Sequence, residues 1–493
     1  MKLKNIIKSV ILLTTLLLLS SCLNEWLTVN PKTEMTRDNL FKSEDGFKDA
    51  LTGVYIQLKS KDGYGERLTM TTLEYLVSSW DVATNTTEQR LTQFMYTDQG
   101  VEKVMNSIFS HQYKVISSIN SILEEIDEKK DLFKTEGLFE LIKGECLGLR
   151  AFLHFDILRL FGPVPELANS DLILPYVKTL SREPIMHLSY NDYLSEILRD
   201  IQEASELLEV CDPIIDYSLI ELRNPGPNKA FNPSDTYFAV RHLRMNYYAI
   251  KSLWARVSLW SGNLNDAYLQ SKSIIEAQDS DGSLKFKLGT SADMSNSNYS
   301  LPFEHIFALH EFSLLNRYND LFAAGLLKKG SSDATVRTQL YGNTGTDIRE
   351  VYLWELITQQ NQSKTYIIKK YMVPEGVPLF SNDFRHISLI RVSELYLIAI
   401  ESAPTIAEAQ IYWDKYRLSR NIPVIPLPSD RVALLDEIIK EYRREFFAEG
   451  QAFYNYKRVN TPKNKVLWAP TSSNVILNYV VPLPKTELIN ASK

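Results

Sequence analysis

Residues 149–165 read Leu-Arg-Ala-Phe-Leu-His-Phe-Asp-Ile-Leu-Arg-Leu-Phe-Gly-Pro-Val-Pro, and this stretch decides the architecture of the chain. Large apolar side chains recur along it at helical spacing, and the pattern extends back toward residue 137, which predicts a helix over about 137–160. The helix should stop at Gly162-Pro163, because glycine permits a left-handed exit and proline cannot continue a helix. Arg150 interrupts the apolar run, and a buried charge of this kind must be paired.

Apolar periodicity predicts further helices on both sides of this stretch. They cover about 43–58, 101–127, 190–209, 234–261, 263–278, 391–403, 406–420 and 431–449. The region 280–385 is different, because Gly, Ser, Asn and Asp interrupt it constantly and pieces such as 365–368 look like strands. We therefore predict a mainly α fold with long irregular loop regions and minor β structure.

Two of the predicted helix pairs look like degenerate tetratricopeptide hairpins. In the clearer pair, Ala255 and Ala267 are the small residues where the helices meet, and Gly262-Asn263 forms the turn. Small residues at these points let two helices approach closely. The stretch 406–416 is a weaker copy. Generic αα-hairpins use Gly and Ala in the same way, so the pattern by itself leaves both a repeat scaffold and unrelated hairpins open.

The first 21 residues predict a signal for export. Three lysines precede an apolar run at 10–19, which is too short for a membrane-spanning helix of about 20 residues. The run ends in Leu-Ser-Ser followed by Cys22, which resembles a bacterial lipobox and implies cleavage before Cys22 and acylation of that residue by palmitate-type chains. Two acyl chains suffice for stable anchoring, so we expect a lipid-anchored protein. The alternative is an ordinary signal peptide with an incidental cysteine.

Composition excludes some classes of function. The formal charge is −6, and removal of 1–21 makes the chain more acidic, so no concentrated basic face is available for nucleic acid. Only Cys146 and Cys211 remain beyond Cys22, and a disulfide between them stays possible, although the chain is no disulfide scaffold. The chain holds 26 Tyr, 21 Phe and 7 Trp against 7 His, so aromatic rings beyond those of the core are available for stacking on ligands.

Four segments together resemble one known family. The helix and exit turn at 149–165, the Arg-x-x-Glu helix at 390–401, the Glu-Arg-Glu-Gly-like helix at 441–450 and the extended Pro-Leu-Pro tail at 481–488 occur in the order seen in the SusD/RagB family. These are outer-membrane nutrient-binding lipoproteins, and the lipobox agrees with them. The charged residues within these segments are expected to form ion pairs inside the scaffold rather than a catalytic pair at Glu445 and Glu449.

The resemblance implies a SusD-like scaffold of tetratricopeptide-like hairpins whose long loops form the ligand face. We expect a signal peptide at 1–21, a lipidated tether at 22–45, an N-terminal half at 46–225 and a C-terminal half at 226–493, packed as one compact unit. The resemblance also implies that the protein catalyses no reaction and needs no cofactor or metal.

The implied partner is a SusC-like TonB-dependent β-barrel transporter in the outer membrane, to which the protein would deliver oligomeric nutrients. Within this family glycans are the more frequent ligands, and an oligopeptide ligand is the alternative. The implied location is the outer membrane, lipid-anchored and facing the exterior. Only one acidic residue, Glu25, closely follows Cys22, which keeps a periplasm-facing orientation open.

Ligand contacts are expected on loops held by the scaffold, at about 60–100 and 280–385. Aromatic faces stack on sugars, while amides and carboxylates bind hydroxyl groups. The candidate ligand-binding residues are Tyr64, Trp80, Asp81, Asn85, Tyr96, Tyr341 and Trp354, with Trp80 as the first choice. Trp80-Asp81 lies where members of the resembled family often carry an acidic loop near the ligand.

Motifs for catalysis fail on inspection. His310-Glu311 begins like a zinc-protease helix, but Leu314 stands where the second zinc ligand should be. Gly325 and Gly330 have the spacing of a phosphate-binding loop, but Ser331 replaces the lysine. Two other functions stay open: a tetratricopeptide-type adaptor that binds another envelope protein, and a carbohydrate-active enzyme, which the missing acid/base pair disfavours.

Overall fold

Helix α7 (Leu138–Phe161) lies at the centre of the molecule and is its most buried long helix. The computed structural model describes residues 37–381 and 383–491, so the predicted signal peptide, Cys22 and most of the tether lie outside the described residues. Only Glu140 and Lys143 of α7 are not buried. The helix ends at Gly162 as predicted, but with an extended backbone (φ −73°) rather than a left-handed one. A Cβ on Gly162 would lie 2.6 Å from the Leu158 carbonyl oxygen, so close approach is what requires glycine.

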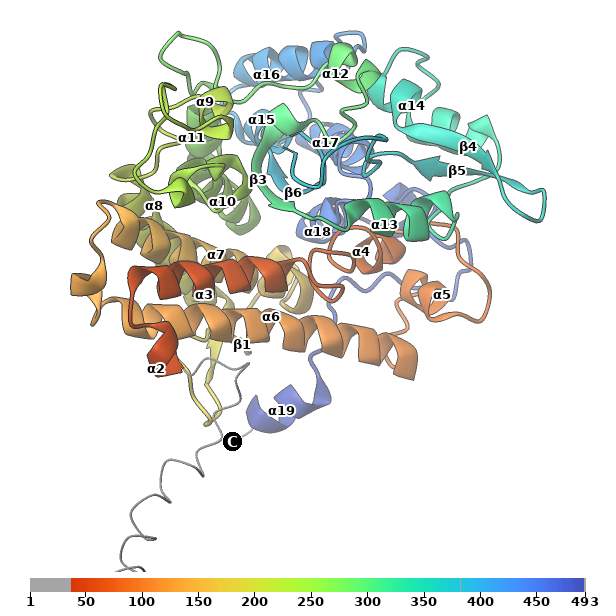
Figure 1. Cartoon of the computed structure of the whole chain (residues 1–493). Coiled ribbons are helices and arrows are strands. Elements are labelled where there is room, and N and C mark those ends of the chain that lie inside the picture. The colour runs from red at the N-terminus through yellow and green to blue at the C-terminus, as the bar shows by residue number, and fades with distance from the viewer. Residues whose placement is uncertain (1–36, 382, 492–493) are drawn as a thin grey trace, which may run out of the picture.

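The N-terminal part of the chain packs a layer of long helices around α7 (Figure 1). Helices α3, α6 and α8 contact α7. The elements of this part are α2 (Arg37–Leu40), α3 (Glu44–Leu58), α4 (Thr72–Leu76), α5 (Thr87–Thr92), α6 (Gln99–Ile126), α7, β1 (Leu172–Pro175), β2 (His187–Ser189), α8 (Tyr190–Glu209) and α9 (Leu219–Arg223). Strands β1 and β2 pair antiparallel and frame an excursion at 176–186.

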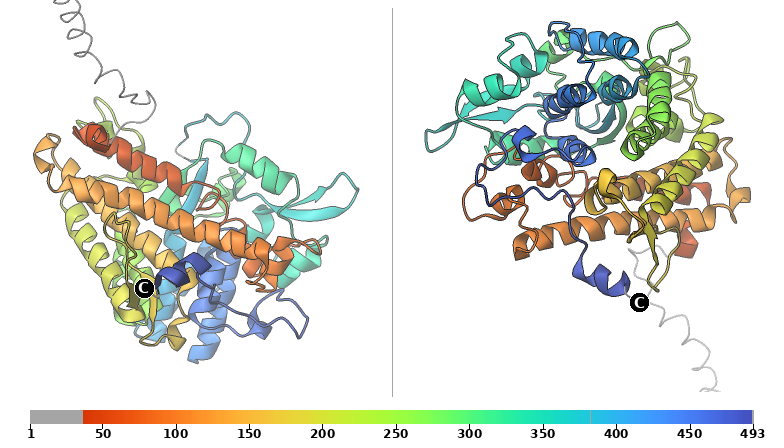
Figure 2. Two further views of the ribbon diagram at one scale, coloured as in Figure 1. Left: turned by 90° about the horizontal axis from the view of Figure 1, so that it is seen from below. Right: turned by 180° about the vertical axis from the view of Figure 1, so that it is seen from behind.

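The C-terminal part adds helical hairpins and two small antiparallel sheets, β3 with β6 and β4 with β5. Its helices are α10 (Tyr247–Ser261), α11 (Leu264–Ile275), α12 (Ser291–Ser295), α13 (Leu314–Tyr318), α14 (Ile348–Tyr352), α15 (Val392–Ser402), α16 (Ile406–Ser419), α17 (Arg431–Glu445), α18 (Gln451–Arg458) and α19 (Lys485–Ala491). Its strands are β3 (His305–His310), β4 (Trp354–Thr358), β5 (Lys364–Ile368) and β6 (His386–Arg391). Figure 2 shows α19 on the underside of the molecule, beside α6.

The two predicted hairpins form. Gly262 ends α10 in the left-handed region (φ 82°), and α11 folds back against α10. Ala255 and Ala267 are both fully buried, as close packing of the two helices requires. Helices α15 and α16 form the second hairpin, and α11 packs on α15, so the hairpins stack side by side.

Two predicted helix boundaries are wrong. The helix predicted at 234–261 begins only at Tyr247, because Asn246 caps it and two single 3-10 turns precede it. The helix predicted at 431–449 stops at Glu445, and the chain turns through Ala448 (φ 64°) and Gly450 (φ 74°) before α18. By contrast, the helix predicted at about 391–403 is confirmed at Val392–Ser402, directly after strand β6 ends at Arg391.

The embedded charges form ion pairs inside the scaffold, as predicted. Arg150 binds Asp200 through two 2.7 Å hydrogen bonds. Glu445 contacts the guanidinium groups of Arg391 (2.7 Å) and Arg420 (2.9 Å), which hold the pKa of this carboxyl well below its usual range despite burial. A catalytic acid needs a raised pKa and an open cleft, so this arrangement serves structure.

Two further sequence expectations concern covalent links and membrane spans. Cys146 and Cys211 are free thiols, so the possible disulfide between them is absent. Within residues 37–381 and 383–491, no helix has both the length and the apolar character needed to cross a membrane.

Candidate ligand-binding face

The two loop regions predicted to carry the ligand lie side by side, with Asp81 joining them. The Asp81 backbone N–H donates to the Lys328 carbonyl (2.9 Å), and the Gly330 N–H donates to the Asp81 carboxylate (2.6 Å). The Lys329 ammonium lies 3.2 Å from the same carboxylate. Asp81 therefore acts as a bridge between the loops, and its side chain remains 45% exposed.

A groove of about 480 Å³ opens next to this junction, within the size range of small-molecule sites. Apolar side chains line it together with hydroxyl and charged groups. The apolar lining is Val82, Ala83, Leu91, Val104, Leu321, Leu326 and Leu327, and the polar lining includes Lys61, Glu66, Arg67, Thr71, Tyr75, Asp81, Thr86, Thr87 and Glu88. Hydroxyl and carboxylate groups together with apolar side chains suit a ligand that offers both C–H surfaces and hydroxyl groups.

Tyr75 supplies a neutral hydroxyl to the groove. Burial raises the pKa of this phenol, and the carboxylates of Glu88 and Glu66 raise it further. The groove lining also contains cations, and the charge of Arg67 is partly neutralised because its guanidinium lies 2.7 Å from the Asp62 carboxylate. The groove thus presents hydrogen-bond donors and acceptors rather than a field of one sign.

A buried carboxyl supports the groove from behind. Glu74, on α4 beside the groove residue Tyr75, is fully buried and accepts hydrogen bonds from the Ser79 hydroxyl (2.5 Å) and the Gly450 N–H (2.9 Å). Burial raises the pKa of Glu74 from 4.5 to about 7, against the opposing effect of these two donors. Because Gly450 belongs to the C-terminal part, Glu74 ties α4 to the opposite half of the chain.

The aromatic residues predicted to contact ligand are buried in this structure. Trp80 is 1% exposed, donates its indole N–H to the Met70 carbonyl (2.8 Å) and packs edge-on against Phe322 and Phe447. Four more of the predicted aromatic residues are buried, namely Tyr64, Tyr96, Tyr341 and Trp354. The Tyr64 hydroxyl donates to Asp156, and the Tyr96 hydroxyl donates to the Asn478 carbonyl. The Trp354 indole N–H donates to the Tyr341 hydroxyl. A ligand could reach these five rings only after rearrangement of the core.

Two predicted positions are accessible. Asp81 faces the groove, and Asn85 lies on the exposed loop after it with a left-handed backbone (φ 60°). Their contact with a ligand stays a prediction.

An exposed aromatic pair lies elsewhere on the face. Phe312 is 53% exposed and Phe380 is 55% exposed, and among the described residues these are the only aromatic side chains so open to solvent. Both pack on the imidazole of His310, with ring-centroid distances of 4.6 Å and 5.2 Å. We call Phe312, His310 and Phe380 the aromatic platform.

Cations hold the platform in place. The Arg385 guanidinium donates to the Phe312 carbonyl (2.9 Å) and the Pro378 carbonyl (3.0 Å), which joins the two segments that carry the rings. The Lys59 ammonium donates to the His310 carbonyl (2.9 Å) and lies 5.7 Å from the Phe312 ring centre. The platform is not among the sites predicted from the sequence, because its two phenylalanines come from separate segments of the chain, and 310–314 by itself resembles only the start of a zinc motif.

Segment 59–67 connects the platform with the groove. Lys59 touches the platform, while Lys61 and Arg67 line the groove. The Arg317 guanidinium donates to the Gly65 carbonyl (2.6 Å), which fixes this segment against α13. Figure 1 shows α4 and α5 just below α13 and strands β4 and β5. Through segment 59–67 the groove and the platform are therefore neighbours.

Behind the platform lies a row of histidines. His386 packs edge-on against His310, His305 and His242, with centroid distances of 5.6 to 6.3 Å. Burial, with the charges of Lys59 and Arg385, lowers the pKa of His310 to about 4, so this ring is neutral at neutral pH. In the part of the chain that the structure describes, no three His, Cys, Asp or Glu residues are placed to hold a metal ion.

Comparison with known sequences identifies one family. A family profile described as "SusD-like_3: Starch-binding associating with outer membrane" matches residues 25–213. SusD-like protein P2 from Formosa agariphila is 22% identical over 182 residues, which cover 36% of this chain and 34% of that protein. The chain therefore matches about a third of the length of this curated relative.

Comparison with solved structures covers nearly the whole chain. A SusD superfamily protein from Bacteroides thetaiotaomicron superposes with a TM-score of 0.68 and 19% identity, over 91% of this chain and 98% of that one. A SusD-like carbohydrate binding protein from Bacteroides vulgatus gives a TM-score of 0.65 at 16% identity, over 91% and 97%. A laminarin binding SusD-like protein gives 0.63 at 16% identity, over 91% and 98%. At these identities the superpositions establish the fold, and the predicted mainly helical SusD-like architecture is confirmed.

Proposed function

We propose, from its similarity to SusD-like proteins, that this chain is a member of the SusD/RagB family that binds oligosaccharides outside the cytoplasm and delivers them to a SusC-like TonB-dependent transporter in the outer membrane. The observation that carries the proposal is the groove with its neighbouring aromatic platform. Sugar rings stack on exposed aromatic faces, and the groove supplies donors and acceptors for their hydroxyl groups.

The relatives support carbohydrate as the ligand class. The family profile is described as starch-binding, and one structural neighbour is named as laminarin binding. The groove residues agree, since its lining combines threonine and tyrosine hydroxyls, carboxylates and apolar side chains. An oligopeptide ligand is the alternative within the same role, because aromatic rings and hydroxyl groups also serve peptides.

Isothermal titration tests the capture function. The full chain carrying Cys22→Ala, which lacks the predicted lipid acceptor, is titrated with starch-derived and laminarin-derived oligosaccharides and with a protein digest. We expect binding to one glycan class, weakened about three- to tenfold by Phe312→Ala or Phe380→Ala, because stacking on an aromatic ring contributes roughly 0.5–1.5 kcal/mol.

A matched control separates the platform from other surface residues. Leu172→Ala removes an apolar side chain that is 62% exposed on β1, away from the groove and the platform, and should leave the affinity unchanged. Binding that survives both phenylalanine variants would remove the platform from the site. Binding of peptides alone would replace the ligand class, and silence toward every ligand would favour the adaptor alternative.

The anchoring and delivery roles need separate measurements. Cys22→Ala should move the protein from the membrane fraction to the soluble fraction, because acylation of Cys22 is the proposed anchor. Purification of the unaltered chain in detergent should recover a β-barrel transporter with it. Recovery of a different envelope protein, together with silence toward glycans, would support the adaptor function instead.

A further inference from the structure

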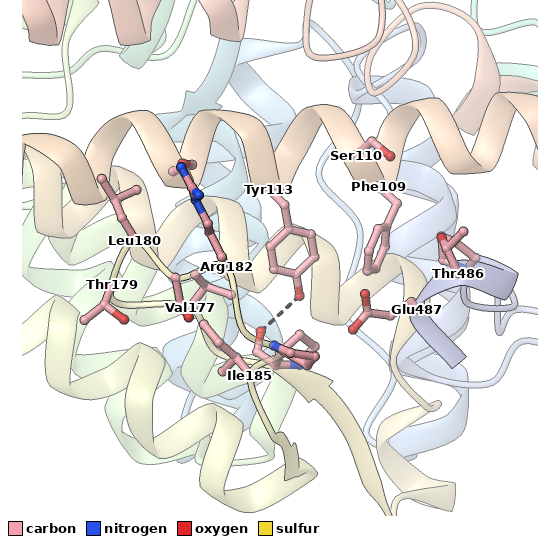
Figure 3. Close-up of a pocket in the computed structure, with 15 residues that line it drawn as sticks. Phe109, Ser110, Tyr113, Val177, Thr179, Leu180, Arg182, Ile185, Thr486 and Glu487 are labelled. Carbon is pink, nitrogen blue, oxygen red and sulfur yellow. Dashed lines mark hydrogen bonds between the residues drawn. The ribbon is translucent and has the colours of Figure 1, made fainter. Parts of the chain in front are cut away.

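A second cavity lies on the underside of the molecule, apart from the groove and the platform. It measures about 540 Å³, opens to solvent, and is lined by α6, by the excursion between β1 and β2 and by the start of α19 (Figure 3). Phe109 and Tyr113 of α6 form its wall, with ring centres 4.7 Å apart. Val104 of α6 lines the groove, whereas Phe109 lines this cavity, so the two hollows use different sides of the same helix.

Hydrogen bonds hold the walls of the cavity in place. The Tyr113 hydroxyl donates to the Pro175 carbonyl (3.0 Å), and the Asn120 amide donates to the Val177 carbonyl (2.9 Å). The Leu180 N–H donates to the Glu124 carboxylate (2.6 Å). These bonds fix the excursion to α6 and preform the cavity, which lowers the entropy cost of binding.

The C-terminal helix completes the cavity and brings a carboxylate to it. Lys485 forms an ion pair with Glu102 of α6 (2.9 Å), which seats α19. The His187 imidazole lies 2.8 Å from Oε1 of Glu487, which orients this carboxylate. The second oxygen of Glu487 has no hydrogen-bond partner within the described residues and is available to a ligand.

A cation stands on the other side. Arg182 lines the cavity from the excursion, is exposed, and makes no ion pair or hydrogen bond with any described residue. Figure 3 shows Arg182 and Glu487 on opposite sides of the Tyr113 ring. Apolar side chains, including Val177 and Ile185, line the cavity around the Tyr113 ring.

We propose that this cavity binds short zwitterionic peptides with apolar side chains. The ligand carboxylate contacts the guanidinium of Arg182, and the ligand ammonium contacts the free oxygen of Glu487. The apolar side chains pack on Phe109 and Tyr113. A guanidinium is well suited to this role, since its planar donors match a carboxylate.

Neutral glycans and fatty acids fit the cavity less well. A neutral glycan would leave both charged groups of the cavity without a partner. A fatty acid would place an apolar chain beside the Glu487 carboxylate. This cavity is separate from the proposed glycan site, so peptide binding here does not depend on glycan binding there.

Calorimetric titration with leucyl-phenylalanine tests the inference on the full chain carrying Cys22→Ala. We expect saturable binding, weakened about tenfold when the dipeptide is C-terminally amidated or N-acetylated, because each change removes one charge-assisted contact. Arg182→Gln should weaken the free dipeptide about tenfold and leave the amidated form unchanged. Glu487→Gln should weaken the free dipeptide about tenfold and leave the acetylated form unchanged.

Lys364→Gln is the matched control, because it removes an exposed cation on β5 far from the cavity and should leave every affinity unchanged. Arg182 is exposed, so its replacement should preserve the circular dichroism and melting temperature of the chain. Equal affinities for the free, amidated and acetylated dipeptides would overturn the proposal. So would binding of laurate or of a neutral oligosaccharide at this cavity in preference to the dipeptide, or no saturable binding of any probe.

Discussion

Replacement of Glu74 by glutamine should stabilise the protein at alkaline pH and leave it unchanged at acidic pH. Glu74 is fully buried behind the groove, and burial raises its pKa from 4.5 to about 7. Between these pH values the folded chain holds a proton that the unfolded chain has released. Stability therefore falls as the pH rises through this window, and the full cost is present above the folded-state pKa.

The size of the effect follows from the pKa values. Folding raises the pKa of the Glu74 carboxyl from 4.5 to about 7. Once Glu74 is ionised in the folded chain, this difference lowers the free energy of unfolding by about 3 kcal/mol. Glutamine has the shape of the protonated acid and carries no charge. Its amide can donate to the Ser79 oxygen while its carbonyl accepts from the Gly450 N–H, so the local hydrogen bonds persist.

Urea denaturation at pH 5 and pH 8, followed by tryptophan fluorescence, measures the effect. We expect Glu74→Gln to exceed the free energy of unfolding of the unaltered chain by less than about 1 kcal/mol near pH 5 and by about 3 kcal/mol at pH 8. Glu88→Gln, which removes a carboxylate lining the groove, controls for the loss of one negative charge. Equal free energies for Glu74→Gln and the unaltered chain at both pH values would refute the reasoning.

Two further predictions concern the scaffold. A Cβ at Gly148 would lie 2.1 Å from the Ile250 side chain, so Gly148→Ala should lower the free energy of unfolding by about 1–3 kcal/mol. A Cβ at Gly53 on α3 would have no atom within 4 Å, so Gly53→Ala should instead raise the free energy of unfolding by about 0.5–1 kcal/mol. Similar urea midpoints for the two glycine variants would contradict this expectation. Arg150→Met leaves the buried Asp200 carboxylate without its cation and should cost about 3–5 kcal/mol. Additional Asp200→Leu should recover most of that stability, and a single-variant cost below about 1 kcal/mol would show that the pair is dispensable.

Helix positions were largely predictable from the sequence, because helical periodicity and end signals are local. The helix around 149–165 begins and ends within about a residue of the prediction, since its apolar run and Gly162-Pro163 need no information from elsewhere. The error at 234–246 has a tertiary cause. Buried Arg241 pairs there with Asp212 (2.9 Å) and Glu145, and these distant carboxylates hold the segment in short turns instead of a helix.

The accessibility of the aromatic residues was not predictable in the same way. Trp80 and Phe312 both follow short polar or charged stretches, and no local pattern separates them. Trp80 is buried because Phe322 and Phe447, hundreds of residues away in the chain, close over its ring. Phe312 stays exposed because its partners, His310 and Phe380, lie beside it on the surface.

By itself the sequence determined the helical class, the order of the hairpins and the pairing of the embedded charges. These properties depend on side-chain period and on the cost of an unpaired buried charge, and both can be read along the chain. The tertiary structure alone decided the surfaces. The groove, the aromatic platform and the cavity between Arg182 and Glu487 each combine segments far apart in sequence, and only packing determines which side chains meet and which face water.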